Sequence, residues 1–169
     1  AEIERLEPIF GDPADGEVHD ALNAAFVTDG AVLRLDRGVV LPGPVHLVFI
    51  ATTPGASNHP RNLVVAAAGA QATVVEHYVG TTGADAAPTL TNVVTRVLAD
   101  ADARVTHLKL QEETPAAIHL AVIAASQARG SRFDSHSVSL GARLARHDIG
   151  TRLDGEASEA LLNGLFHVD

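Results

Sequence analysis

The sequence predicts an all-β fold, a parallel β-helix, preceded by one short N-terminal helix. Beyond residue 30, segments rich in Val, Ile, Leu and Thr alternate with turn signals, as strands and loops do. Similar residues recur in these segments about every thirty residues, a period typical of stacked coils. Aromatic residues make up only 4% of a chain that is 46% hydrophobic. Small apolar side chains suit an interior in which the same positions stack coil upon coil.

Residues 1–30 are expected to form an N-terminal helical segment. Asp12 and Pro13 are a typical start signal, and Gly30 lies beyond the expected end of the helix. Between them, apolar residues fall at the spacing of one helix face: Val18, Ala21, Leu22, Ala25 and Phe26. No linker divides the rest of the chain, so residues 31–169 are expected to form a single β-helix core.

Nine segments of this core have the composition of strands. They are Val45–Ala51, Asn62–Ala67, Thr73–Val79, Leu90–Leu98, Arg104–Gln111, Ile118–Ala124, Arg132–Leu140, Ala145–Leu153 and Ala160–Val168. Several are apolar on both faces, which is unusual for a one-sided antiparallel sheet. Residues 52–60 and 80–88 are rich in turn-forming residues and are expected to be surface loops. An Ala-rich helix remains the alternative for residues 116–128.

Histidines give the repeat. One set has members 29 to 31 residues apart: His46, His77, His107, His136 and His167. A second set interleaves with it at spacings of 27 to 30 residues: Asn62, Asn92, His119 and His147. Two strand types therefore alternate, and we expect at least three consecutive histidines of the first set on one side of a solenoid. Neither set has helical spacing and no Trp-Asp signature occurs, which argues against helical solenoids and propellers.

Composition excludes several classes of function. The formal net charge of −9 argues against nucleic acid as a partner, because an acidic surface repels phosphate backbones. No apolar run reaches the length of a membrane span and no signal-peptide pattern occurs, so the cytoplasm is the expected location. Cysteine is absent, which excludes disulfides and thiolate metal ligands. Methionine is absent even at position 1, and we expect a fragment of a longer protein.

The serine-rich segment 135–139 does not predict a catalytic triad. Ser135, Ser137 and Ser139 share one strand face, and His136 points to the opposite face. A serine beside a histidine along a strand cannot reach it as nucleophile to base. No Gly-x-Ser-x-Gly elbow occurs anywhere. The segment is therefore expected to be structural.

Residues 145–153 separate charged from apolar positions. The charged positions form a row of opposite-sign neighbours on the expected outer face: Arg146, Asp148, Arg152 and Asp154. His147 falls on the apolar face, where a hydrogen-bonded core histidine is favoured over a metal ligand. Stacked histidines could share a metal ion, but no local His-x-His or His-Glu-x-x-His signature supports this.

No catalytic residue and no metal ligand is assigned, and cofactor-binding residues remain unknown. Glu112 and Glu113 are adjacent in a strand, so they point to opposite faces and form a poor acid–base pair. Gly-rich phosphate-binding loops of the Walker A or Gly-x-Gly-x-x-Gly type are also missing. ATP hydrolysis by this chain is therefore not expected.

Four segments of the chain resemble the SufB/SufD family of the SUF iron–sulfur cluster assembly machinery: residues 22–49, 59–80, 107–113 and 131–166. The last segment is the most specific, with Arg-x-Asp-Ile at 146–149, Leu-Asp-Gly at 153–155 and Asn-Gly-Leu at 163–165. The resemblance runs from about Asp20 onward, with the segments in the same order. The lack of cysteine favours the SufD branch over the SufB branch, whose role in the family involves cysteines.

The resemblance implies a right-handed β-helix that acts as a scaffold subunit and not as an enzyme. It implies pairing with a SufB-like subunit, and with a SufC-like ABC-type ATPase through regions that this chain lacks. The family's further C-terminal coils and helical region would follow Asp169. No cofactor is expected to be bound firmly here, and an iron–sulfur cluster would form in the complete complex. The family's partner-facing histidine maps to no position in this chain, so no site residue is carried over.

Two other classes of function stay open. A β-helix carbohydrate lyase or hydrolase would need carboxylates, or calcium with Lys or Arg, clustered on one outer face. A His-lined metal-binding β-barrel protein would need three histidines within about 2.1 Å of one ion. Residues 160–169 contain no Lys or Pro, the usual protection of an edge strand. We therefore also expect edge-to-edge self-association through this end.

Overall fold

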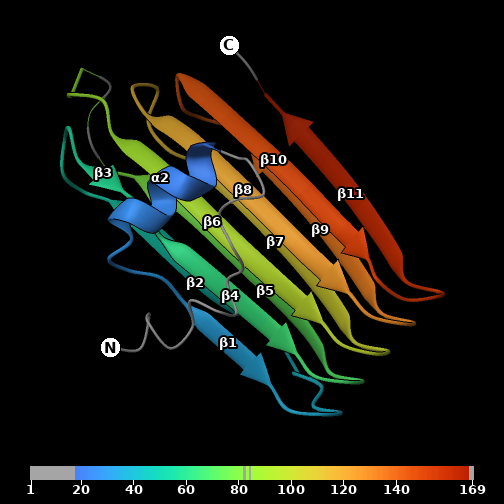
Figure 1. The fold of residues 1–169 in the computed structure, drawn as a ribbon. Coiled ribbons are helices and arrows are strands. Elements are labelled where there is room, and N and C mark those ends of the chain that lie inside the picture. Colours follow the sequence, from blue (N-terminus) through green and yellow to red (C-terminus); the bar gives the residue numbers. More distant parts are fainter. Residues whose placement is uncertain (1–17, 82, 84, 168–169) are drawn as a thin grey trace.

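The computed structural model describes residues 18–81, 83 and 85–167. These residues form one helix and eleven strands, wound into a parallel β-helix (Figure 1). The helix is α2 (Val18–Phe26). The strands are β1 (Val32–Leu35), β2 (Val45–Ala51), β3 (Ser57–Asn58), β4 (Arg61–Ala66), β5 (Gln71–Gly80), β6 (Leu90–Ala99), β7 (Arg104–Glu112), β8 (Ile118–Gln127), β9 (Arg132–Ser139), β10 (Leu144–Leu153) and β11 (Glu159–Phe166). The predicted fold class, an all-β solenoid with a short N-terminal helix, is confirmed.

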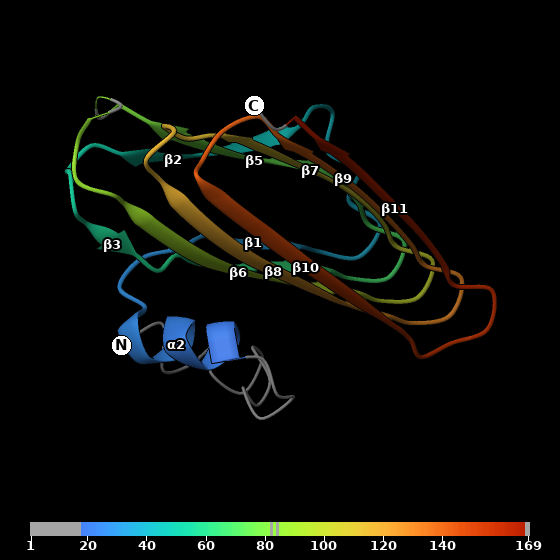
Figure 2. The ribbon, with the colours of Figure 1, turned by 90° about the horizontal axis from the view of Figure 1, so that it is seen from above.

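The strands lie in two sheets that form the long walls of the solenoid (Figure 2). Sheet A has the order β1, β4, β6, β8, β10, with β3 also paired to β6, and sheet B has the order β2, β5, β7, β9, β11. All strand pairs between named strands in the described part of the chain are parallel. From β4 to β11, successive strands alternate between the sheets, so each coil adds one strand to each wall. Backbone hydrogen bonds then run from coil to coil.

All nine predicted strands are present, with ends shifted by a few residues; Val168, the predicted end of the last one, lies outside the described residues. The helical alternative for residues 116–128 is wrong, because β8 lies between β6 and β10 and is hydrogen-bonded to both. Its alanines at inward positions, Ala121 and Ala125, are 2% and 3% exposed. Two short strands were not predicted. These are β1, and β3, which lies inside the segment 52–60 that was expected to be a loop.

The histidine repeat lies on one side of the solenoid, as predicted, but its side chains do not all point the same way. The members from His46 to His136 lie in successive strands of sheet B, and His167 directly follows β11. The rings of His46 and His77 stack at 5.7 Å between centroids, whereas the register places His136 opposite Asn163. His107 is fully buried, so it faces the interior, while the strand alternation turns His77 and His136 outward.

A left-handed backbone conformation recurs at one corner of the solenoid, where the chain passes from sheet A to sheet B. The φ angles at this corner are +72° at Gly38, +71° at Gly69, +59° at Asp102, +68° at Gly130 and +57° at Ala157. Glycine adopts this conformation without steric cost, whereas Asp and Ala are strained by it. The corner therefore has the same period as the coils, although glycine occupies only three of its five positions.

The helix α2 packs against the outer face of sheet A (Figure 2) through polar and not apolar side chains. The predicted apolar stripe does not make this contact, since Val18 is 76% and Phe26 59% exposed. The buried residues are Asp20 and Asn23. Asp20 binds Arg61 at 2.6 Å and Arg96 at 2.5 Å, and Asn23 Nδ2 donates to the Pro60 and Asn92 carbonyls. The buried carboxylate thus compensates two arginines of the sheet.

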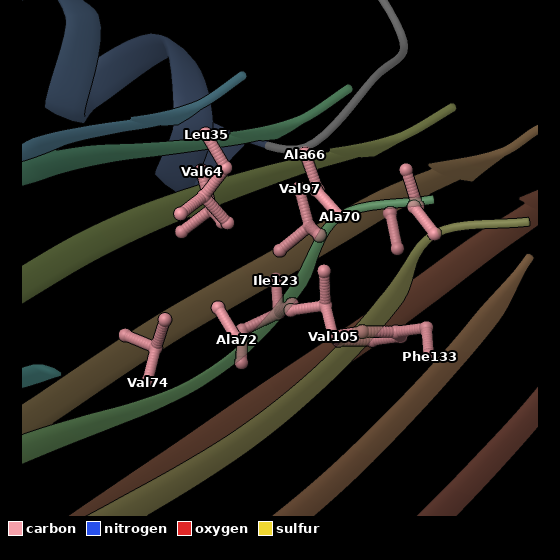
Figure 3. Packing of buried hydrophobic residues seen from close by; sticks show 13 residues of the cluster. Leu35, Val64, Ala66, Ala70, Ala72, Val74, Val97, Val105, Ile123 and Phe133 are labelled. Atoms are coloured by element: carbon pink, nitrogen blue, oxygen red, sulfur yellow. The ribbon is translucent and has the colours of Figure 1, made fainter. Parts of the chain in front are cut away.

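The apolar core fills one half of the interior, toward the ends of the sheet A strands and the starts of the sheet B strands. Figure 3 shows Val64, Val97 and Ile123 of sheet A facing Val105 and Phe133 of sheet B. Each of these side chains is 2% exposed or less. Burial of this kind stabilises the fold by about 25 cal/mol per Å² of apolar surface. The other half of the interior has a different composition.

Candidate functional site

The second half of the interior is lined by polar and charged side chains. They occupy the inward positions at the ends of the sheet B strands and the starts of the sheet A strands, and parallel register stacks them coil upon coil. One column runs Glu76, Lys109, Ser137, and the next runs Tyr78, Gln111, Ser139. Thr91, His119 and Thr95 face them from sheet A. We call this set, together with Asn62, His107, Glu113, Ser135 and His147, the interior polar network.

Glu76 is the centre of the first part of the network. Its side chain is buried and accepts hydrogen bonds from Thr95 Oγ1 at 2.7 Å, Tyr78 OH at 2.8 Å and Asn62 Nδ2 at 3.1 Å. His107 Nε2 lies 3.5 Å from its Oε2 atom. Burial alone would raise the pKa of Glu76, but the charge of His107 and these hydrogen bonds outweigh it and lower the pKa to about 2. The carboxylate is therefore ionised at neutral pH and joins sheet B to sheet A.

Glu113 is the centre of the second part, immediately after β7. Thr91 Oγ1 donates to it at 2.5 Å, His119 Nδ1 at 2.7 Å and Gln111 Nε2 at 3.3 Å. Burial would raise the pKa of Glu113, and the bonds from His119, Thr91 and Gln111 lower it. Burial lowers the pKa of His119, as does the charge of Lys109. His119 is thus a neutral imidazole that donates from Nδ1 and presents a lone pair at Nε2.

Lys109 carries a buried ammonium group. Its side chain is 1% exposed, and Nζ lies 5.9 Å from the centre of the Tyr78 ring. Burial lowers its pKa to about 8, although the carboxylates of Glu76 and Glu113 oppose this shift. At neutral pH the lysine therefore stays mostly charged and partly balances the two carboxylates.

His147 faces the interior, as predicted from the alternation of its strand. Burial lowers its pKa to about 3, with a further effect from the positive charges of Lys109 and His107. The predicted hydrogen bond is missing at Nε2, which is buried and has no partner among the described residues. In the described part of the chain, no three His, Cys, Asp or Glu side chains are arranged to hold a metal ion.

The other sequence predictions about strand faces are confirmed. Ser135, Ser137 and Ser139 are buried, while His136 lies on the outer face and contacts Asn163. Glu112 is exposed and Glu113 buried. On β10, Arg146 pairs with Asp148 at 2.7 Å and Arg152 with Asp154 at 2.8 Å, which gives the predicted rows of opposite charges.

Sequence reasoning missed the interior polar network itself. Its signal is the alternation in β7, where the inward positions His107, Lys109 and Gln111 are all polar and the outward positions include Leu108 and Leu110. Alternation shows that one face of this strand is apolar and the other charged. It predicts a polar interior only when the position of the strand in the solenoid is already known.

One pocket of about 270 Å³ lies beside this network, at the β2 end of the solenoid. Its lining includes Tyr78, Thr91 and Glu113 of the network, and His59. The rings of Phe49 and Tyr78 stack at 4.9 Å between centroids, with 9° between their planes. The pocket brings solvent to the edge of the network. The network holds buried charge, and its contacts are those of a cross-link between the two sheets.

No helix in the described residues is both long enough and apolar enough to cross a membrane.

Comparison with known proteins shows the family. Residues 49–169 match the family described as SUF system FeS cluster assembly, SufBD core domain. The chain is 34% identical, over 92% of its length, to an iron–sulfur cluster assembly SufBD family protein of Synechocystis. It is 35% identical, over 63% of its length, to the iron–sulfur cluster assembly protein SufD of Escherichia coli, and 24% identical, over 86%, to the chloroplastic protein ABCI7 of Arabidopsis thaliana.

The chain covers 36% of the length of the Synechocystis protein, 25% of the E. coli protein and 32% of the Arabidopsis protein. The family match includes β3 to β11 and the whole interior polar network. From the match and the parallel β-helix, we conclude that the chain belongs to the SufBD core domain family of the SUF iron–sulfur cluster assembly system.

Proposed function

We propose that this chain is the scaffold part of a protein that takes part in iron–sulfur cluster assembly through the SUF system. The observation that carries the proposal is the match of residues 49–169 to the SufBD core domain. The names of two relatives, both iron–sulfur cluster assembly proteins, support it. In this role the chain supplies a rigid shape for an assembly complex, and the iron–sulfur cluster is the product of that complex.

The interior polar network supports a scaffold and not a catalytic role. Glu76 and Glu113 are buried and bound by side chains of both sheets. A carbohydrate-cleaving β-helix enzyme would need such carboxylates on an outer face, within reach of a polysaccharide. The metal-binding β-barrel alternative is not supported, because the two sheets form a solenoid. We propose that the protein is not an enzyme by itself.

We further propose that the complete protein acts in the cytoplasm, paired with a SufB-like subunit and with a SufC-like ABC-type ATPase. The family resemblance implies that the contact with the ATPase is made through regions that this chain lacks. This chain is expected to bind iron weakly if at all, which isothermal titration with Fe²⁺ checks. Stoichiometric, micromolar binding that disappears in His136→Ala or His147→Ala would contradict this.

Edge-to-edge self-association is a separate proposal about β11. All eight of its residues are exposed, and no strand of the described part of the chain pairs with its outer edge. Its apolar side chains include Leu165 and Phe166, 60% and 59% exposed. An unprotected edge of this kind pairs readily with another strand. Sedimentation should show dimers of this chain that dissociate in Leu165→Lys, and a strictly monomeric parent chain would contradict the proposal.

Deletion of the gene in its host tests the assembly function. We expect the activities of enzymes that contain iron–sulfur clusters to fall, and enzymes without clusters to be unaffected. Expression of the complete protein should restore the activities. Unchanged activities of cluster-containing enzymes in the deletion strain would contradict the proposal.

A further inference from the structure

The interior polar network contains buried polar atoms that have no protein partner among the described residues. These atoms are His107 Nδ1, Lys109 Nζ, His119 Nε2, Ser135 Oγ, Ser139 Oγ and His147 Nε2. Strand alternation and register turn all of them toward the same half of the solenoid interior. Lys109, His107, His119 and Ser135 are each 1% exposed or less.

Such a concentration of unpartnered atoms indicates a bound guest, that is, a small molecule or ion inside the solenoid. Burying a polar group without a hydrogen bond is costly, and almost all buried polar groups in folded proteins bind protein or ordered water. An isolated exception could be tolerated, but here the atoms belong to neighbouring positions in β7, β8, β9 and β10. The residues around them are small, since Ser135, Ser137, Ser139 and Ala121 occupy inward positions.

The hydrogen-bonding chemistry selects the kind of guest. The Lys109 ammonium can only donate, so the guest must accept. His119 already donates from Nδ1 to Glu113, and its neutral Nε2 can only accept, so the guest must also donate. A metal ion would be repelled by Lys109 and cannot accept its protons. A halide cannot donate to His119, whereas water both donates and accepts.

We propose that this half of the interior is a binding site for ordered water, centred on the Lys109 ammonium group. The water joins Lys109 to the imidazoles of His119 and His147 and to the hydroxyls of Ser135 and Ser139. It completes the cross-link between the sheets that Glu76 and Glu113 begin. The pocket lined by Tyr78 and Glu113 brings bulk solvent to the edge of this site.

A high-resolution crystal structure of the protein tests the proposal. We expect density peaks at hydrogen-bonding distance, about 2.7–3.2 Å, from Lys109 Nζ and from at least two of the other unpartnered atoms. In Lys109→Met the peaks nearest Nζ should be lost. Leu110→Met, on the outer face of the same strand, is the matched control and should keep every peak.

A measurement in solution covers the case in which Lys109→Met does not fold. The ¹⁷O relaxation dispersion of water should show long-lived buried molecules in the unmodified protein and fewer of them in Ser139→Ala. Three results would overturn the proposal. The first is a Lys109 ammonium bound directly to Glu76 or Glu113 with no density beside it. The second is anomalous scattering from a metal ion or halide at the site, and the third is a dispersion amplitude that Ser139→Ala leaves unchanged.

Discussion

His119 Nδ1 lies 2.7 Å from Glu113 Oε2, and this contact joins β8 of sheet A to the residue that follows β7 of sheet B. The two side chains are 0% and 2% exposed, so neither can exchange its partner for bulk water. The solenoid is therefore held together by buried polar cross-links in one half of its interior and by apolar packing in the other.

Replacing His119 by Leu should destabilise the fold, because Glu113 remains buried with one donor fewer. We expect the free energy of unfolding to fall by about 2–4 kcal/mol, as measured by urea denaturation at neutral pH. Glu112→Gln is the matched control, since the Glu112 side chain is 43% exposed where it meets His77. Its loss should be about 1 kcal/mol or less. Equal losses in the two variants would show that the buried contact is not a cross-link.

Acid should weaken the fold partly through Glu76. The pKa of Glu76 is lowered to about 2 from an ordinary value of 4.5, so its carboxylate stabilises the fold above pH 4.5. This contribution is lost as the pH falls from 4.5 through about 2, because the unfolded chain takes up the proton first. In Glu76→Gln, the acid-induced fall in unfolding free energy should be smaller by about 3 kcal/mol. If the free energy of unfolding depends on pH in the same way in Glu76→Gln and in the parent protein, Glu76 does not have this role.

Alkali should strengthen the fold through Lys109 over a limited range. Its pKa is lowered to about 8 from 10.5, so above pH 8 the folded protein has released a proton that the unfolded chain still holds. The free energy of unfolding should therefore rise with pH by about 1–2 kcal/mol. The rise should end near pH 10. Burial raises the pKa of Tyr78, so above pH 10 the unfolded chain loses the tyrosine proton first, and the free energy of unfolding then falls. In Lys109→Met the free energy of unfolding should not rise over this pH range. If it rises as in the parent protein, another group is responsible.

Removing the buried carboxylate under α2 should detach the helix from sheet A. Asp20→Ala leaves the guanidinium groups of Arg61 and Arg96 without their shared carboxylate. We expect a loss of about 3–5 kcal/mol and faster amide hydrogen exchange in α2. Arg129→Ala is the control, because its pair with Asp102 is exposed and should contribute about 1 kcal/mol or less. Unchanged exchange in α2 would mean that Asp20 does not anchor the helix.

The positions of the strands could be predicted from the sequence because each strand is a short apolar run between turn signals. The helix could be predicted from its apolar spacing, but its contact face could not. Asp20 and Asn23 are buried against partners 37 to 76 residues away along the chain, and no local pattern identifies such partners. β1 and β3 have four and two residues, too few for a periodic signal.

The interior polar network could not be predicted, because alternation shows that two faces differ but not which face is inside. In residues 75–79 both faces contain apolar residues, and only the coil register turns Glu76 and Tyr78 inward. The usual rule that charged residues face solvent is reversed here by partners from neighbouring strands. The inward position of His147, by contrast, could be predicted from alternation alone, because the opposite face of its strand is charged.

Affinity purification of the complete protein from its host is the most direct test of the assembly function. We expect a SufB-like subunit and an ABC-type ATPase to be isolated with it in a fixed ratio, identified by mass spectrometry. Repeated isolation of the folded protein without either partner would contradict the proposed assembly function.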